Sequence, residues 1–288
     1  MWAKWMERPR LYWHMTKSLQ TGLLLSTGIA GYYSAHAGLH GTGAQVVGLI
    51  VSLYLAIVGS TVLNMWYDRD IDARMYRTCW RPLPAGKVSP TEALRLGLVL
   101  SIAGLGLALA LAPLYALVVF AGWFCDVVVY TLWLKRRTPW SIVWGGLSGG
   151  MPVLAGRVLA VGRVDLIGLL LALAVLFWIP THIVTFALRY DEDYRRAGVP
   201  TIPSVYGPRF AYATIAAAAV LAAGTIIAAA WRIGLTTGAL EMLVVLSVAL
   251  AWLALTVVRR PTPKRNFLLF KFASLYMLFT MALIAWGA

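Results

Sequence analysis

The chain has 288 residues, of which 60% are hydrophobic and only 12% are charged, and its mean hydropathy is +0.76. This composition excludes an ordinary soluble domain and indicates a protein that crosses a membrane several times. A net charge of +14 would suit nucleic-acid binding in a soluble protein, but in a membrane protein it is better explained by basic cytoplasmic loops.

Nine apolar segments are long enough to span a membrane, because crossing about 30 Å of hydrocarbon takes roughly 20 helical residues. They lie near residues 19–38, 44–63, 89–111, 113–134, 138–160, 165–188, 209–231, 236–257 and 267–286. The sequence therefore predicts an all-α, polytopic membrane protein with about nine transmembrane helices in a single membrane-embedded domain over residues 1–288.

Basic residues divide unevenly between the two sides of this predicted bundle. With nine spans, all but three of the 25 Lys and Arg residues fall on the side of the N-terminus, the exceptions being Arg157, Arg163 and Arg232. Such an excess marks the cytoplasmic side, so we expect a cell-membrane protein with its N-terminus inside and its C-terminus outside. Residues 1–17 mix Trp and Tyr with Lys and Arg, which predicts an interfacial segment at the lipid headgroups.

A polar stretch directly follows the second apolar segment: Asn64-Met-Trp-Tyr-Asp68-Arg-Asp70-Ile-Asp72. If the helix continues through it, residues four apart lie along one face, which aligns Asn64, Asp68 and Asp72 and turns Asp70 elsewhere. Two carboxylates and an amide oxygen are hard ligands that suit Mg²⁺. The alternative interpretation is a solvated loop of Asp–Arg pairs at the membrane edge.

Asp126 and His182 are ionisable residues inside predicted membrane segments. Asp126 lies in the fourth segment with Tyr130 one turn further on the same face, and His182 lies near the end of the sixth. A charged group in hydrocarbon is costly, so Asp126 is expected to face the bundle interior or a wet cavity. Each of these residues has a structural alternative, namely a polar contact between helices for Asp126 and a hydrogen-bonded core position for His182.

A second acidic cluster follows the sixth segment, in Arg189-Tyr-Asp191-Glu-Asp193-Tyr194-Arg195-Arg196. It shares the cytoplasmic face with the first cluster, and both are followed by arginines and proline. Two such clusters above an apolar interior suit the ionisation of a polyprenyl diphosphate, because metal and Arg offset the charge on the departing diphosphate. We expect Arg77, Arg81, Lys135 and Arg196 to converge on that diphosphate from separate loops.

Several motifs extend this pattern over most of the chain. They are Asn64…Asp68-Arg-Asp70-Ile-Asp72-Ala-Arg-Met75…Arg77-Thr78…Arg81-Pro82-Leu, Ala85-Gly86, Tyr130…Leu134-Lys135-Arg136-Arg137-Thr138, Ile142-Val143-Trp-Gly145-Gly146, Pro180-Thr-His182 and Asp193-Tyr194…Ala197-Gly198-Val199-Pro200. Together they resemble the UbiA superfamily of intramembrane prenyltransferases, and within it the protoheme IX farnesyltransferase branch. The Met75…Arg77-Thr78 element and the run that starts at Asp193 favour the haem branch.

The resemblance implies nine helices around a central cavity open to the cytoplasmic face, Mg²⁺ as cofactor, and transfer of a farnesyl-like group from its diphosphate to haem B, giving haem O after water adds. The active-site loops would be residues 64–88 and 189–208. The expected metal ligands are Asn64, Asp68, Asp72, Asp191 and Asp193. The expected catalytic residues are Asp68, Asp72, Arg77, Arg81 and Asp193, and the expected substrate contacts are Asn64, Lys135, Arg136, Arg196, Tyr130, Asp126, His182 and Tyr194.

Departures from the haem branch leave other acceptors open. The branch has Pro-Pro-His-Phe where this chain has Pro180-Thr-His182-Ile, and Thr201-Ile-Pro203 is more similar to branches with aromatic acceptors. Those branches carry two aspartates where this chain has Tyr190 and Tyr194, so a second metal site would use Asp191, Asp193 or both. The alternative acceptors are an aromatic acid, a quinone precursor or a glycerol-phosphate lipid.

The chemistry of the acceptor favours haem B. A vinyl group can attack an allylic cation with its own π electrons, whereas a phenol gains from a nearby base, and the predicted interior offers few bases. His182 would then line the haem site and touch the iron or a propionate. A non-enzymatic transporter is the competing class, but the acids cluster at one membrane face instead of along a path through the midplane.

Overall fold

The computed structural model describes residues 2–35 and 41–288, and every regular element in those ranges is a helix. In chain order these are α1 Trp2–Met15, α2 Ser18–Tyr33, α3 Gly43–Tyr67, α4 Arg69–Arg74, α5 Pro90–Leu111, α6 Pro113–Phe124, the π-helix η2 Cys125–Leu134, α7 Ser141–Val161, α8 Leu166–Arg189, α9 Asp191–Ala197, α10 Ile202–Ile233, α11 Thr237–Arg259 and α12 Pro263–Gly287.

Eight spans in the described ranges are long and apolar enough to cross a membrane, namely α3, α5, the continuous α6–η2 span, α7, α8, α10, α11 and α12. The 16-residue helix α2 packs among them as a ninth, and residues 36–38 of the first predicted span lie outside the described ranges. The predicted all-α membrane bundle of about nine helices is confirmed.

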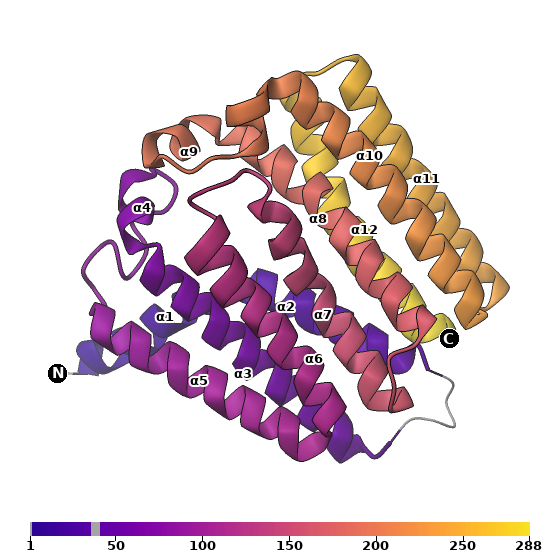
Figure 1. The fold of residues 1–288 in the computed structure, drawn as a ribbon, viewed down its shortest axis with the longest axis horizontal. Helices are drawn as coiled ribbons and strands as arrows, with labels where there is room; N and C mark the ends of the chain where they lie inside the picture. The colour runs from indigo at the N-terminus through magenta and orange to yellow at the C-terminus, as the bar shows by residue number, and fades with distance from the viewer. Residues whose placement is uncertain (1, 36–40) are drawn as a thin grey trace.

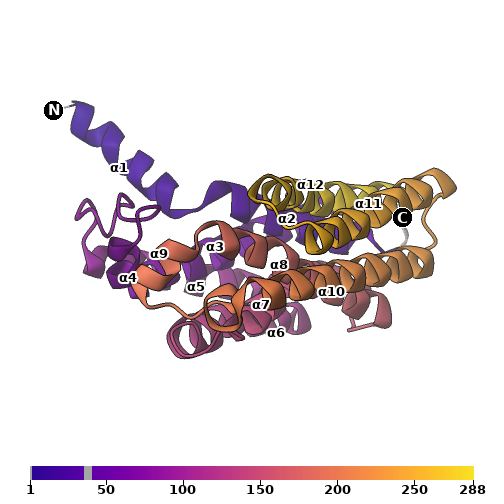
Figure 2. The same cartoon turned by 90° about the horizontal axis from the view of Figure 1, so that it is seen from above.

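The spans pack in sequence order and the bundle closes on itself. Each span from α5 to α12 contacts the next, and α12 returns to contact α2 as well as α8. Short helices α4 and α9 lie side by side at one end of the bundle, and α1 projects from the same end (Figures 1 and 2). The two acidic stretches, far apart in sequence, are therefore neighbours in space.

Close packing of α2 on α7 joins the bundle across its middle. A side chain at Gly31 would overlap the backbone carbonyl of Val153, so these two helices approach at a distance that only glycine permits. At the far end of this contact, Arg157 is 6% exposed, and its guanidinium donates to the Asp165 carboxylate at 2.7 Å and to the Ser34 carbonyl at 2.6 Å. Pairing of this kind compensates for burying the charge.

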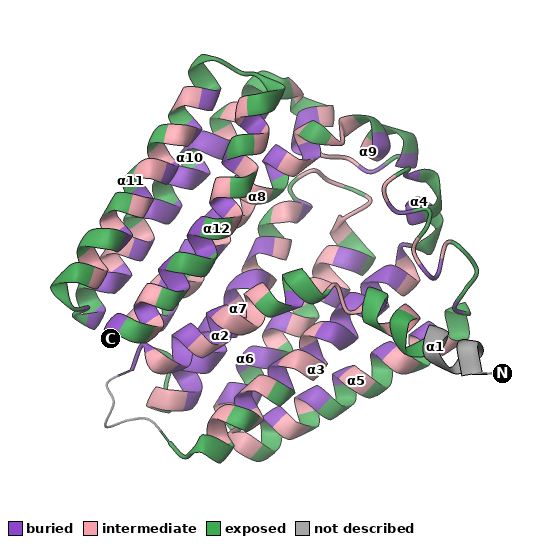
Figure 3. Cartoon of the chain, turned by 180° about the vertical axis from the view of Figure 1, so that it is seen from behind, coloured by how far each residue is buried: buried purple, intermediate pink, exposed green. Residues whose placement is uncertain are grey.

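The outer faces of the helices are apolar. Large hydrophobic side chains are exposed along α5, α11 and α12, and the buried positions of these helices face inward (Figure 3). Such extensive exposed apolar surface is consistent with helices that face lipid. The start of α5 follows the sequence prediction, because Ser89 accepts a hydrogen bond from the Glu92 amide at 3.2 Å and Pro90 occupies the first turn.

The structure differs from the sequence expectations in three elements. The helix does not run unbroken through the first acidic stretch, because α3 ends at Tyr67 and Asp68 takes a non-helical conformation before α4. The fourth span changes at Cys125 from an α-helix to a π-helix. The seventh begins at Ile202, earlier than predicted, because a kink at Gly207 and Pro208 lets a further turn precede it.

Candidate active site

A row of three oxygen-bearing side chains lies where α3 meets α4. The break at Asp68 preserves their spacing, because the Asp68 amide donates to the Asn64 carbonyl at 2.9 Å and the Asp72 amide to the Asp68 carbonyl at 2.8 Å. Asn64, Asp68 and Asp72 are 9%, 1% and 5% exposed, whereas Asp70 is exposed. The shared face expected from the sequence is therefore present, and the alternative of a solvated loop does not fit such burial.

Two cations neutralise these carboxylates. Lys135 Nζ pairs with Asp68 Oδ2, and Arg81 Nη1 lies 2.8 Å from Asp72 Oδ2. Burial disfavours the Lys135 ammonium, but the Asp68 carboxylate outweighs this effect and raises the pKa of Lys135. Asp68 Oδ1 has no hydrogen-bond partner among the described residues, and Arg136 Nη2 is 3.7 Å away.

The donor set of this row fits a magnesium ion. Mg²⁺ prefers carboxylate and carbonyl oxygens and is usually held by one or two carboxylates together with substrate phosphates. The unpartnered Oδ1 of Asp68, the Asp72 carboxylate and the amide oxygen of Asn64 supply ligands of that kind. Among the described residues no three His, Cys, Asp or Glu side chains are arranged so that they could hold a metal ion, so the Asn64 amide and the substrate would have to complete the coordination.

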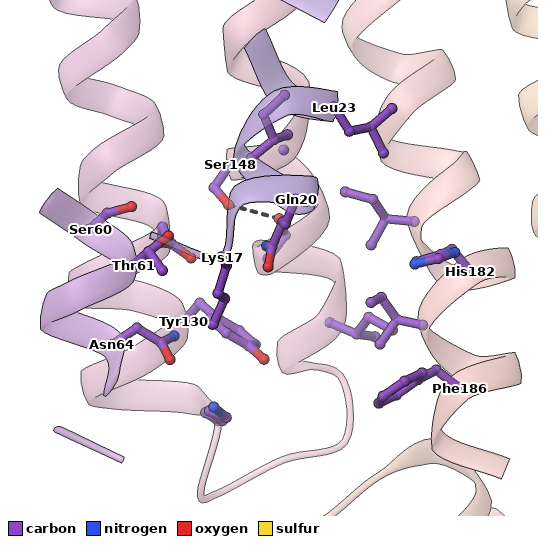
Figure 4. A pocket seen from close by; sticks show the side chains of 18 of the residues that line it. Lys17, Gln20, Leu23, Ser60, Thr61, Asn64, Tyr130, Ser148, His182 and Phe186 are labelled. Carbon is purple, nitrogen blue, oxygen red and sulfur yellow. Dashed lines mark hydrogen bonds between the residues drawn. The ribbon is translucent and has the colours of Figure 1, made fainter. Parts of the chain in front are cut away.

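Beyond this row the bundle encloses a cavity of about 990 Å³, the upper end of the size range of small-molecule sites. Its mouth carries Asn64, Asp72, Arg77, Arg81 and Lys135, and its interior is mainly apolar. Figure 4 shows Ser60, Thr61 and Asn64 on one wall and His182 and Phe186 on the opposite wall, with Lys17 and Tyr130 between them. The cavity thus joins a charged mouth to a space that suits a lipid tail.

The π-helix explains how Tyr130 and Lys135 reach the same site. In an α-helix, residues five apart diverge around the axis, but here the Lys135 amide donates to the Tyr130 carbonyl at 2.8 Å, closing a wider turn. Lys135 Nζ lies 5.6 Å from the centre of the Tyr130 ring, and both residues line the cavity. A Cβ at residue 145 would lie 3.3 Å from this ring, so Gly145 leaves room for Tyr130.

Arg77 is held at the mouth by stacking and by its backbone. Its guanidinium carbon lies 4.9 Å from the centre of the Phe186 ring and 5.5 Å from that of Tyr190. Asp193 accepts hydrogen bonds from the amides of Tyr76 and Arg77 at 3.1 and 3.3 Å. Arg77 Nε is buried without a hydrogen-bond partner in the described structure, which leaves a donor for an anion.

Four expected ligands or substrate contacts are placed differently from the sequence expectation. They lie outside the cavity lining, as Asp68 does beside Lys135, and each has another partner. Asp193 accepts hydrogen bonds from the backbone of residues 76–77, and Asp191 pairs with Arg195 at 2.6 Å. Arg136 forms two hydrogen bonds to Asp70, and Arg196 pairs with Glu192 at 3.1 Å and lies over the Tyr76 ring. The physical reason is that short-range partners within α4, α9 and their loops satisfy these charges before they can reach the cavity. Asp191 Oδ1 nevertheless stays buried and unpartnered within the described residues. Tyr194, by contrast, lines the cavity.

His182 occupies an aromatic stack on the cavity wall. Its ring lies parallel between Trp178 and Phe270, with centroids 5.0 and 4.6 Å away, and Ser274 Oγ is 3.2 Å from its Nδ1. No hydrogen bond of the described residues involves Nε2. Asp126 also lines the cavity, as expected from the cost of placing a carboxylate against lipid.

Lys17 is a cavity residue that sequence reasoning missed. The sequence predicts an interfacial segment over residues 1–17, but Lys17 joins α1 to α2 with a left-handed backbone, φ 45° and ψ 56°, and its side chain lines the cavity (Figure 4). Burial, followed by the charges of Arg81 and Lys135, lowers the pKa of Lys17 to about 8. The one available signal was a lysine at the boundary between the basic segment and the first apolar run.

Comparisons with known proteins agree with this geometry. The sequence profile of the UbiA prenyltransferase family matches residues 24–280. A protoheme IX farnesyltransferase of Desulforudis audaxviator is 37% identical over 93% of this chain and 85% of its own, and one of Archaeoglobus fulgidus is 45% identical over 70% of each. Among solved structures, a digeranylgeranylglyceryl phosphate synthase has a TM-score of 0.80 at 18% identity, and the match covers 98% of both chains. A UbiA homologue from Archaeoglobus fulgidus bound to GPP and Mg²⁺ has a TM-score of 0.72 at 15% identity, and the match covers 95% of this chain and 99% of its own.

Proposed function

This chain belongs to the UbiA prenyltransferase family, and from that premise we propose that it transfers a farnesyl-like group from its diphosphate to a vinyl group of haem B, with Mg²⁺, to form haem O. The observation that carries the proposal is the buried carboxylate row, neutralised by Lys135 and Arg81, at the mouth of an apolar cavity. The names of the relatives support haem as the acceptor.

Asn64, Asp68 and Asp72 would hold the metal, which supplies charge neutralisation for the departing diphosphate. Arg77, Arg81 and Lys135 donate hydrogen bonds to the phosphate oxygens as the carbon–oxygen bond breaks, and these bonds strengthen as negative charge builds. Asp191, with its unpartnered oxygen, is the acid of the second cluster that could serve a second ion. The apolar interior binds the prenyl chain and keeps water from the allylic cation.

His182 orients the acceptor in this proposal. Its stack between Trp178 and Phe270 fixes the ring, and the contact of Nδ1 with Ser274 leaves Nε2 for the haem iron or a propionate. Attack of the vinyl group on C1 of the prenyl cation leaves a cation on the haem side chain, which takes up water and releases a proton. No general base is needed for the attack itself.

The test is product analysis with purified protein. Incubation with farnesyl diphosphate, haem B and Mg²⁺ should release diphosphate and give a haem whose mass has increased by one farnesyl group and one hydroxyl. Titration with haem B should give a Soret shift that His182→Ala alters. If a hydroxybenzoate is prenylated and haem B is not, the protein belongs to the aromatic-acceptor branch. If no acceptor gives Mg²⁺-dependent release of diphosphate, a transporter is favoured.

A further inference from the structure

We infer that Thr131 is a positioning residue for the metal site, acting through the amide of Asn64. The inference rests on the proposed magnesium site and adds to it a residue of η2 that touches neither metal nor substrate. Thr131 is 1% exposed and lies outside the cavity lining.

The Thr131 hydroxyl joins two hydrogen bonds in series. Asn64 Nδ2 donates to Thr131 Oγ1 at 2.9 Å, and Thr131 Oγ1 donates to the Asp126 carbonyl at 2.7 Å. A hydroxyl has a single hydrogen, so once that hydrogen goes to a carbonyl the oxygen can only accept from its other partner. The Asn64 side chain must therefore turn its NH₂ group toward Thr131 and its oxygen away.

This orientation matters because the two ends of an amide are opposite in function. The oxygen is a ligand for a hard cation, whereas the NH₂ group repels it, and rotating the side-chain amide by half a turn would exchange the two. Asn64 lies on the cavity wall with Ser60 and Thr61 (Figure 4). The hydroxyl of Thr131 thus selects the amide orientation in which Asn64 can bind the metal.

The π-helix makes the selection possible. In an α-helix a Thr hydroxyl bonds to the carbonyl three or four residues earlier, but Thr131 reaches the carbonyl of Asp126, five residues earlier. The wider turn also brings Thr131 against α3, where it meets Asn64. The same irregular segment therefore supplies the cation Lys135 and the support of the amide ligand.

The experiment measures metal affinity without turnover, using Mn²⁺ as a paramagnetic probe of the detergent-solubilised protein, with and without inorganic diphosphate. Thr131→Val removes the hydroxyl at similar volume, and we expect it to weaken Mn²⁺ binding by roughly 10- to 100-fold, the usual effect of losing a residue that supports a ligand. Thr131→Ser, which keeps the hydroxyl, should bind as wild type does. If the valine variant does not fold, Thr131→Ala carries the same test.

A double-mutant cycle identifies the route of the effect. In an Asn64→Ala background, Thr131→Val should cause no further loss, because the ligand that Thr131 orients is already gone. Wild-type affinity in Thr131→Val, or an equal further loss in the Asn64→Ala background, would overturn the inference. Failure of the wild-type protein to bind Mn²⁺ under both conditions would instead count against the proposed metal site itself.

Discussion

At the scale of single residues, the site depends on burying charges that compensate each other. Asp68 and Asp72 are almost fully buried, and each pairs with a cation: Asp68 with Lys135, after η2, and Asp72 with Arg81, in the loop after α4. Ion pairs of this kind are weak evidence for stability, because desolvation offsets most of the attraction. Their placement at the mouth of a cavity is better explained by function, since the same cations can bind phosphate oxygens.

The carboxylates themselves give the first prediction. Asp68→Asn and Asp72→Asn should leave a folded protein, because the amide preserves shape and hydrogen bonding, but should lower the prenyl-transfer rate by roughly 10²-fold or more through lost metal binding. The measurements are gel filtration in detergent and initial rates across a Mg²⁺ titration. Near-wild-type turnover at low Mg²⁺ in either variant would remove the metal site from this row.

The cations give the second prediction, with a matched control. Arg81 lines the cavity mouth, whereas Arg196 is an arginine of the same end of the bundle that pairs with Glu192 outside it. Arg81→Ala should weaken competitive inhibition by diphosphate by roughly ten- to a hundredfold, as expected for a lost charge-assisted hydrogen bond. Arg196→Ala should leave the inhibition constant unchanged. Equal effects of the two variants would mean that only overall charge matters.

Lys17 gives the third prediction, a dependence on pH. Its pKa is lowered to about 8 by burial and by Arg81 and Lys135, with Asp72 and Asp126 opposing the shift. A lowered pKa means that the cation is lost as pH rises through about 8, earlier than for a free lysine. Diphosphate binding should therefore weaken between pH 7 and 9 in the wild type. The Lys17→Met variant should bind diphosphate more weakly than the wild type at pH 7 and should not show this decrease. Because the ionisation of diphosphate affects both proteins equally, the difference between their pH profiles reports on Lys17. Parallel pH profiles would exclude Lys17 from the site.

At the scale of elements, the two acidic stretches pack against each other. Helices α4 and α9 contact each other, and Ile71, Met75, Ala197 and Val199, from these helices and the residues that follow them, form one buried apolar cluster. Asp193 is 6% exposed and accepts two backbone hydrogen bonds from residues 76 and 77. The second stretch therefore fixes the loop that presents Arg77.

This packing gives the fourth prediction. Asp193→Ala should free the loop of residues 75–78 and lower prenyl-transfer activity, because Arg77 loses its position. The Mn²⁺ affinity of the row formed by Asn64, Asp68 and Asp72 should stay within about twofold of the wild type, since sites that share no partners act independently. Limited proteolysis should show faster cleavage in this loop. A large loss of Mn²⁺ affinity would place Asp193 among the metal ligands, as the sequence first suggested.

At the scale of the whole molecule, α1 and the short helices α4 and α9 of the two acidic stretches lie at one end of the bundle (Figure 2). All but three of the 25 Lys and Arg residues belong to the predicted N-terminal side. An excess of Lys and Arg marks the cytoplasmic side, so we propose that this end faces the cytoplasm. Both substrates would then enter from that side or from the lipid.

Orientation is the subject of the fifth prediction, which uses the cysteines already present. Both are free, and Cys79 is exposed in the loop after α4, whereas Cys125 is half-buried in a span. A membrane-impermeant maleimide should label inside-out vesicles and leave intact cells unlabelled. Cys79→Ser should abolish labelling and Cys125→Ser should preserve it. Labelling of intact cells at Cys79 would reverse the orientation.

The sequence by itself determined the features that depend on local chemistry. Apolar run lengths predicted the spans, because lipid requires about 20 apolar residues for each. The i, i+4 spacing predicted the shared face of Asn64, Asp68 and Asp72, which survives a helix break because the backbone hydrogen bonds on either side keep it. The motifs predicted the family to which the chain belongs.

Only the tertiary structure decided which charges reach the cavity. From the sequence, both Arg81 and Arg196 are expected to bind the diphosphate, but Arg196 pairs with Glu192 on its own short helix and Arg81 pairs with Asp72. The tertiary structure also placed Lys17 in the cavity through a left-handed turn, and it aligned Tyr130 with Lys135 through a π-helix. Neither irregularity has a hydropathy signal, because a left-handed residue and a π-helical turn change the backbone conformation and its hydrogen bonds without changing the pattern of apolar residues.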